Sequence, residues 1–359
     1  MVTRDKCLNG TVLHLLVFLA GVLTLVSAPL ELARSETVTG WADVHVHIDG
    51  LPNTVHDSVA SLIRGMDEEG MRAAVVMIVP RPAPRSNYSL FASELKSFPD
   101  RFRFLGGGGI LNPMIQRAVQ LGAVPPPLRQ RFTQAAKRIL DDGAVGFGEM
   151  TAQHLSLVPE HPYEACAPDH PLLLLLADIA SEAGVVVDFH LDLVIRRIES
   201  LPGNILGNKN PESLEPNVDA FERLLTHNSK AKIVWAHAGS DPLGQWTPSV
   251  SRELLGRHPN LYMSIRVPPN DRLARRVIFS NGTVDEEWLA VLRDFPDRFV
   301  MGGDQFVVSG LPDRVPIMRF SKMAAHIRSE SRRFLEALPE ALARKIGYEN
   351  AERLYKLPH

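Results

Sequence analysis

The sequence places two histidines, His45 and His47, one residue apart in the segment 43–47. Alternate side chains of an extended strand point to the same face, so both imidazoles can reach one metal ion. The residues between and after them are apolar, which is typical of a buried strand. We interpret this pair as a candidate metal-binding motif, and two polar residues on a solvated face are the alternative.

Two further histidines, His190 and His237, each end a strongly apolar, strand-like segment, and Glu149 and Asp304 end two other segments of this kind. A single histidine at such a position is more often an ordinary core residue. The complete set supplies the nitrogen and oxygen ligands that Zn²⁺, Mn²⁺ and Fe²⁺ accept. The sequence therefore predicts a site for one or two divalent ions, with Zn²⁺ as the first choice.

Such a site has a defined chemistry. A bound divalent ion lowers the pKa of its water towards ~7 and polarises the carbonyl that is attacked. Asp304 would accept the proton of the water and deliver it to the leaving group. The expected reaction is hydrolysis of a C–N or C–O bond in an amide, lactone or ester of a small molecule.

Short strand-like runs alternate with longer amphipathic stretches from Trp41 onward, which indicates repeated βα units around a parallel sheet. Eight units predict an α/β fold of the (β/α)8 TIM-barrel type, whose active site lies at the carboxyl ends of the strands. The expected strands are residues 43–47, 73–79, 102–108, 144–150, 185–191, 232–237, 260–265 and 299–304.

Helices are expected at residues 172–183, 219–227 and 285–294, and one long helix is expected at 330–354. Long βα loops are expected at 80–89, 112–131, 151–170, 192–217 and 266–282. In a barrel, loops that follow strands build the pocket.

Arg266, which ends the seventh strand, and His154, on the loop after the fourth, are the candidate substrate-binding residues. An arginine there can bind a carboxylate or a phosphate. Asp192 lies two residues beyond His190 and is expected to orient that imidazole. Weaker candidates, for which a solvated loop position is the alternative, are Arg81, Arg85 and His161.

At these motifs the chain resembles the amidohydrolase superfamily, and more narrowly the amidohydrolase-related branch that includes the aminocarboxymuconate semialdehyde decarboxylase-like proteins. The resemblance covers about residues 41–357, and its motifs are specific for the superfamily but weak for the substrate. It is carried by His45, His47, His190, the run 233–239 with His237, Asp304 and the closing segment 347–355.

In that branch the resemblance implies one metal, held by the two histidines of the first strand with His190 and Asp304, while His237 acts on substrate or water. Glu149 also resembles the strand-four carboxylate of TatD-like and phosphotriesterase-like members, which bridges to a second metal. His190 and His237 would then hold that second ion. The one-ion arrangement is preferred, and the number of ions stays open.

Two other functions compete with hydrolysis. The branch resemblance includes metal-dependent, non-oxidative decarboxylases that use the same ligands, so a lyase is the first alternative. A non-catalytic exported barrel that binds a ligand is the second. The presence of Asp304 argues against this second alternative, because a binding module needs no proton shuttle.

The bulk composition fits one large domain at residues 40–359 of the 359-residue chain, because barrels routinely use 250 residues or more. A formal net charge of -2 gives no basic surface for nucleic acid. Two cysteines, Cys7 and Cys166, are too few for a disulfide scaffold. A small-molecule substrate is therefore the expected partner, and the choice between a monomer and a homo-oligomer stays open.

Residues 1–35 are expected to be a signal peptide or an N-terminal anchor. Arg4 and Lys6 precede an apolar run at 11–28, whose last residues are small. This run is short for a spanning helix, which needs ~20 residues. We therefore expect export to the periplasm or the medium without stable membrane insertion after processing, and an uncleaved anchor is the alternative.

Overall fold

The computed structural model describes residues 40–48, 54–78, 88–157, 163–203, 205, 209–268, 276–313 and 317–359. The chain divides into Met1–Ser35 and Glu36–His359, and the following description concerns the second unit. The expected signal segment, Arg81, Arg85 and His161 lie outside the described residues. Among the described helices, none is long and apolar enough to span a membrane.

All strands pair in parallel, and every strand expected from the sequence is present. The strand bounds are β1 Trp41–Ile48, β2 Met71–Met77, β3 Phe102–Phe104, β4 Gly106–Gly107, β5 Gly146–Thr151, β6 Val186–His190, β7 Lys232–Ala238, β8 Leu261–Ile265, β9 Phe299–Met301 and β10 Gln305–Val307.

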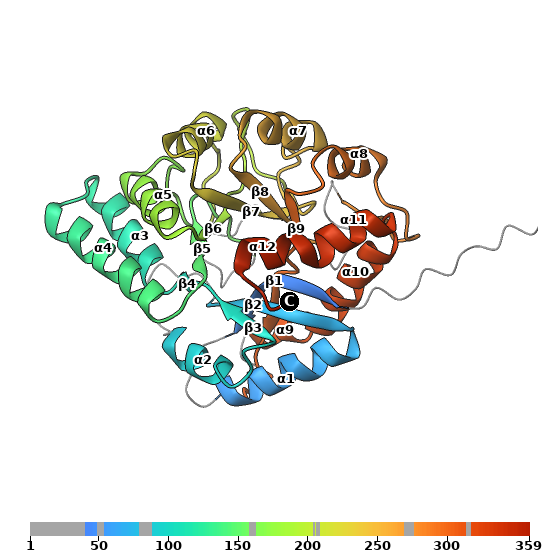
Figure 1. Cartoon of the computed structure of the whole chain (residues 1–359). Helices are drawn as coiled ribbons and strands as arrows, with labels where there is room; N and C mark the ends of the chain where they lie inside the picture. The colour runs from blue at the N-terminus through green and yellow to red at the C-terminus, as the bar shows by residue number, and fades with distance from the viewer. Residues whose placement is uncertain are drawn as a thin grey trace, which may run out of the picture. The chain divides into compact units, whose positions relative to one another are not determined.

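The ladders form two sheets, one ordered β10-β1-β2-β3 and the other β4-β5-β6-β7-β8-β9. Only Leu105 separates β3 from β4, and only residues 302–304 separate β9 from β10. The third and eighth strands are thus each split in two, and their halves join the two sheets. The resulting cyclic order of eight strands is that of a (β/α)8 barrel, in which helices surround the strands (Figure 1).

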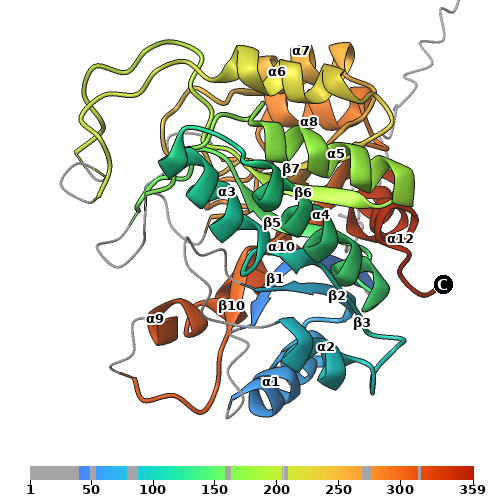
Figure 2. The same cartoon turned by 90° about the vertical axis from the view of Figure 1, so that its left-hand side faces the viewer.

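The helix bounds are α1 Val55–Glu68, α2 Tyr88–Leu95, α3 Leu111–Leu121, α4 Pro126–Asp141, α5 Pro171–Ala183, α6 Val218–His227, α7 Pro248–Arg257, α8 Glu286–Asp294, α9 Ile317–Ser321, α10 Ala324–Glu336, α11 Glu340–Arg344 and α12 Asn350–Tyr355, with a π-helical turn η1 at Lys345–Glu349. The loop between β6 and α6 extends on the side of the barrel away from α12 (Figure 2).

The predicted helix at 172–183 is confirmed, and its ends show why it forms there. The His170 side chain accepts the backbone N–H of Leu172 at 3.2 Å, and Pro171 occupies the first turn, where its missing N–H has no intrahelical partner to lose. Gly184 ends the helix with a φ of 67°. The other two predicted helices match α6 and α8.

Two expectations about the outer layer are wrong. The expected loop at 112–131 contains most of α3 and the start of α4, because Pro126 and Pro127 begin a helix instead of interrupting one. The expected single helix at 330–354 is broken, since Pro339 cannot donate a helical hydrogen bond and α11 starts only after it.

Two hydrophobic clusters hold the barrel together. The larger one lies between the strands and the helices around them, and the smaller one fills the barrel interior. In β6, Val187 belongs to the outer cluster and Val186 to the inner one, as alternation requires. Leu354 and Tyr355 of α12 pack into the inner cluster and close that end of the barrel, opposite the strand ends that carry the site.

Candidate metal centre

A bulge in β1 places the first two histidines. The register between β1 and β2 shifts between Asp43 and Val46. Val44, inside the shifted segment, belongs to the inner cluster, and Val46, where pairing resumes, belongs to the outer one, so regular alternation is broken between them. His45 and His47 consequently face the interior, whereas Asp43 lies behind the strand.

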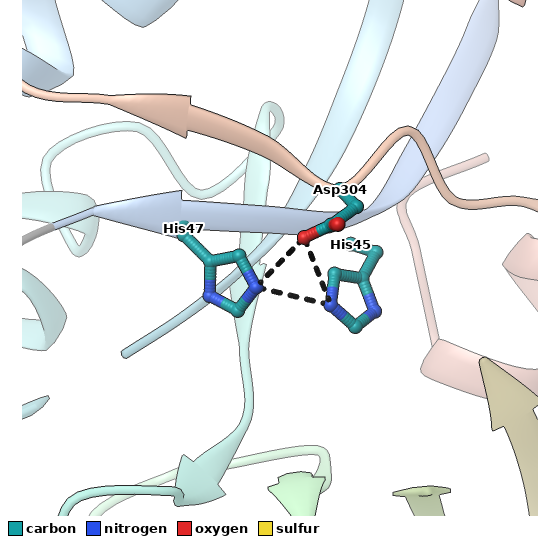
Figure 3. Close-up of side chains that lie close together, drawn as sticks. All are labelled: His45, His47 and Asp304. Atoms are coloured by element: carbon teal, nitrogen blue, oxygen red, sulfur yellow. Dashed lines mark hydrogen bonds and ion pairs between the residues drawn. The ribbon is translucent and has the colours of Figure 1, made fainter. Parts of the chain in front are cut away.

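His45, His47 and Asp304 point toward one another at the carboxyl ends of their strands (Figure 3). The Nε2 atoms of the two histidines are 3.1 Å apart. Oδ1 of Asp304 lies 3.3 Å from Nε2 of His47 and 3.8 Å from Nε2 of His45. Three potential ligand atoms from two neighbouring strands therefore converge on one buried point.

The Glu149 carboxylate lies between this triad and the other two histidines. Its Oε1 is 2.7 Å from Nδ1 of His190 and 3.0 Å from Nε2 of His237. Its Oε2 is 3.5 Å from Nε2 of His47. The structure thus brings all six predicted residues together, but His190 contacts Glu149 and is not grouped with the triad of the first strand.

Backbone conformation turns two of these side chains inward. His237 and Asp304 have φ values of 76° and 54°, which non-glycine residues seldom adopt. Trp235, two residues before His237, lies in the outer cluster, and the β7–β8 register shifts between Trp235 and Ala238. With regular alternation, the side chain of His237 would point outward as that of Trp235 does. The left-handed backbone of His237 therefore turns its imidazole into the site.

The two carboxylates of the site are held in the ionised form. Burial alone would raise the pKa of Glu149, but the surrounding histidines, His45 foremost, hold it well below its usual range. Burial likewise opposes ionisation of Asp304, and the Arg266 guanidinium, followed by His237, lowers its pKa instead. Both groups are therefore available as anionic ligands at neutral pH.

The histidines respond in different ways. Burial disfavours the charged form of His45, yet Asp188 and Glu149 hold its pKa well above its ordinary value. Asp192 and Glu149 raise the pKa of His190 to about 10 in the same way. The pKa of His237 is lowered, mainly by burial. The buried carboxylates thus favour positive charge at His45 and His190, and they would favour a divalent cation at the same place.

This donor set fits a divalent ion. In each of two groups, His45 with His47 and Asp304, and His45 with Glu149 and His237, the ligand atoms lie within 4.8 Å of one another. All the imidazoles are buried, and the mixture of nitrogen and carboxylate oxygen suits Zn²⁺ and similar ions.

Two polar residues that the sequence reasoning missed support the ligands. Asp188 Oδ1 lies 3.3 Å from Nδ1 of His45, on the side of the imidazole away from the triad. Asn112 donates to the carbonyl of Glu149 at 2.8 Å and accepts the N–H of Thr151 at 3.2 Å, which fixes the strand around that carboxylate. Asp188 had a usable signal, because it shares the inward face of β6 with His190.

The candidate substrate residues take different positions. Arg266 Nη2 lies 3.1 Å from Oδ2 of Asp304, and its Nη1 donates to Ser240 Oγ at 3.0 Å. Oδ2 of Asp192 lies 3.4 Å from Nε2 of His190, as expected. The His154 ring packs edge-on against His190, with centroids 4.1 Å apart.

A cavity of 20 Å³ adjoins the site and is bordered by its polar groups. It has room for about one water molecule. Trp246, whose indole stacks on Trp235 at 3.5 Å, forms part of its wall. The residues that line it are Leu157, His190, Leu191, Asp192, Leu193, Ala236, His237, Ser240, Asp241, Pro242, Trp246 and Arg266.

The chain is similar to known proteins in its family pattern and its fold. A family model described as Amidohydrolase matches residues 113–357. A solved variant of organophosphorus hydrolase is 16% identical, with a TM-score of 0.51, and the match covers 88% of this chain and 92% of that one. An amidohydrolase from Pseudomonas aeruginosa is 9% identical, with a TM-score of 0.48, over 89% of this chain and 96% of that one. A comparison with curated proteins gives no match.

Proposed function

The chain belongs to the amidohydrolase family, and from this premise we propose that it is a metal-dependent hydrolase that cleaves a C–N or C–O bond of a small molecule. An amide, a lactone or an ester is the proposed substrate class. The observation that carries the proposal is the convergence of His45, His47 and Asp304 on one buried point at the carboxyl ends of the barrel strands.

His45, His47 and Asp304 would hold the first ion, for which we propose Zn²⁺. Glu149 offers a second position together with His190 and His237, because its Oε1 lies 2.7 Å and 3.0 Å from those two imidazoles, while the same oxygen lies 3.7 Å from Nε2 of His45 and Oε2 lies 3.5 Å from Nε2 of His47. A carboxylate placed between the two groups of histidines favours the two-ion alternative. A divalent ion bound here lowers the pKa of a coordinated water and polarises the carbonyl under attack.

Asp304 is the proposed proton carrier. Its Oδ1 faces His47, and its Oδ2 forms an ion pair with Arg266. The carboxylate is ionised, and its left-handed backbone turns it toward His45 and His47. It accepts a proton from the attacking water and passes it to the leaving group.

Arg266 is the proposed contact to the substrate, and His237 would join it in the one-ion arrangement, in which its imidazole binds no metal. The lowered pKa of His237 keeps its imidazole neutral, so it can donate one hydrogen bond and accept another. Arg266 borders the cavity and can bind an anionic group of the substrate. Binding of such a group would draw the guanidinium away from Asp304 and free Oδ2 to accept a proton.

Non-oxidative decarboxylation is the alternative use of the same residues. The position of Arg266 beside Asp304 favours it, because a guanidinium can hold the carboxylate of an acidic substrate against the site. Release of carbon dioxide from an unsaturated or aromatic acid would distinguish this reaction from hydrolysis.

We also propose that the protein is exported, on the basis of the basic and then apolar composition of residues 1–35. Mass spectrometry of the protein recovered from fractionated cells tests this. An N-terminus downstream of the apolar run in an extracytoplasmic fraction is expected, and an intact N-terminus in the cytosolic fraction would contradict it.

The hydrolase proposal is tested with protein stripped by a chelator and then reloaded with Zn²⁺, Mn²⁺ or Fe²⁺. Aryl esters, lactones and N-acyl amino acids are the substrates, and acid release is measured at constant pH. Turnover of at least one class is expected only after reloading. If the protein binds metal, hydrolyses none of these classes and releases carbon dioxide from an acid, the hydrolase proposal is wrong and the lyase alternative holds.

A further inference from the structure

A buried chain of hydrogen bonds runs from an outer helix to the backbone of the metal centre. Arg328 of α10 donates from Nη1 to Gln305 Oε1 at 2.8 Å. Gln305 donates from Nε2 to Oδ2 of Asp43 at 2.7 Å. Oδ1 of Asp43 accepts the backbone N–H of His45 at 3.0 Å and that of Gly303 at 2.9 Å. All three side chains are buried.

Asp43 connects two strands where regular pairing is interrupted. His45 lies in the bulge of β1, and Gly303 lies in the gap between β9 and β10. Oδ1 of Asp43 therefore fixes the backbone of His45, a proposed ligand, and the backbone of Gly303, which precedes the ligand Asp304. Gly303 permits this approach, because a Cβ at that position would lie 2.7 Å from Oδ2 of Asp43.

Arg328 sets the orientation of the Gln305 amide, and with it the direction of the hydrogen bond from Gln305 to Asp43. A guanidinium only donates, so it turns the carbonyl of Gln305 outward and the amide NH₂ toward Asp43. Without the arginine, the amide can reverse, and its carbonyl would then face a buried carboxylate. The surrounding structure has room for the guanidinium because residue 65 is glycine, where a Cβ would lie 2.2 Å from Arg328 Nη2.

We infer that Arg328 is a positioning residue for the metal centre, acting from outside the barrel through Gln305 and Asp43. This inference rests on the metal centre of the proposed function and goes beyond it. Arg328 itself contacts Gln305, and its effect is on the alignment of the strands that carry His45 and Asp304. Partners that orient metal ligands typically change metal affinity by about 10–100-fold when they are lost.

Arg328→Met removes the donor while it keeps an unbranched apolar side chain. The matched control is Arg332→Met, one turn further along α10. Arg332 forms ion pairs with Glu69 at 3.1 Å and Glu336 at 3.4 Å and does not contact Gln305 or Asp43. Both proteins are loaded with Co²⁺, and the affinity is measured by competition with a chelator, together with the visible spectrum of the bound ion.

Arg328→Met is expected to bind Co²⁺ about 10-fold or more weakly, with shifted absorption bands, whereas Arg332→Met keeps the wild-type affinity and spectrum. Gln305→Asn, whose amide is one methylene shorter, is expected to resemble Arg328→Met, and it decides the matter if that variant does not fold. If Arg328→Met and Gln305→Asn fold and show wild-type Co²⁺ affinity and spectra, the inference is overturned and the proposed function stays intact. A wild-type protein that binds no Co²⁺ would instead refute the metal centre and the inference with it.

Discussion

Arg266 and Asp304 form an ion pair of 3.1 Å, and this pair gives the two oxygens of the Asp304 carboxylate different partners. Oδ2 faces the guanidinium, while Oδ1 faces the imidazole of His47 at 3.3 Å. One oxygen is thus placed to bind an ion, and the other is held by a cation that also borders the cavity.

Arg266→Met should raise the pH at which activity is lost on acidification. Burial opposes ionisation of Asp304, and Arg266 is the main group that lowers its pKa, so removal of the guanidinium lets this pKa rise. Initial rates across the acid range measure the shift. Arg257→Met, at an exposed ion pair on α7, is the control and should leave the acid limb in place. An unchanged acid limb in Arg266→Met would show that Asp304 is not the titrating base.

Asp304→Asn should remove turnover while the barrel still folds. The amide keeps the shape of the side chain but cannot accept a proton, and loss of a general base commonly lowers the rate by about 10²–10⁴-fold. Initial rates and the thermal unfolding temperature are measured on the same preparation. Near wild-type activity in this variant would show that Asp304 does not carry the proton.

Glu149→Gln should lower the number of bound ions from two to one. The neutral amide lacks the negative charge with which the carboxylate would contact both an ion at the triad and an ion at His190 and His237. Titration of the metal-free protein with Zn²⁺ gives the stoichiometry. Glu222→Gln is the control, because this carboxylate of α6 pairs with Arg257 and His258 and is not one of the six residues of the metal centre. Equal stoichiometry in wild type and Glu149→Gln would favour the one-ion arrangement.

Asp241 should make the protein less stable as the pH rises from about 4 to about 6. Burial raises its folded-state pKa from 3.8 to about 6, against the hydrogen bonds from Leu243 and Trp246. The folded state then binds the proton more tightly than the unfolded state, so this stability is present at low pH and is lost through the folded pKa. The shift corresponds to roughly 3 kcal/mol.

Urea unfolding of wild type and Asp241→Asn at several pH values isolates this contribution. The difference in unfolding free energy between the two proteins should change across this interval, in the direction that penalises the wild type at higher pH. A difference independent of pH would contradict the assignment to Asp241.

Much of the barrel was predictable from the sequence because the strand signals are strong and local. His190 illustrates this, since it ends an apolar run and regular alternation in β6 places it inside. Pro126 and Pro339 show the limit of local signals. Both are prolines, but the first begins a helix and the second separates two, and the outcome depends on the turn in which each lies.

The six residues singled out in the sequence lie together in the fold, but their arrangement was not predicted. The bulge after Asp43 and the left-handed backbone of His237 both reverse the face that alternation assigns. Such irregularities arise from the tertiary packing of neighbouring strands, and the sequence pattern contains no periodic signal for them. For the same reason, the chain from Arg328 to Asp43 was not visible before the fold, because its members are far apart along the sequence.

The content of divalent metal per chain tests the central claim most directly. Wild-type protein, His45→Ala, His190→Ala and the surface control His227→Ala are each loaded with Zn²⁺, dialysed and measured by elemental analysis. We predict two ions in the wild type and in His227→Ala, a loss of both in His45→Ala, whose imidazole belongs to both groups of ligand atoms, and a loss limited to the second ion in His190→Ala. Wild-type protein that retains no metal under any loading condition would contradict the account.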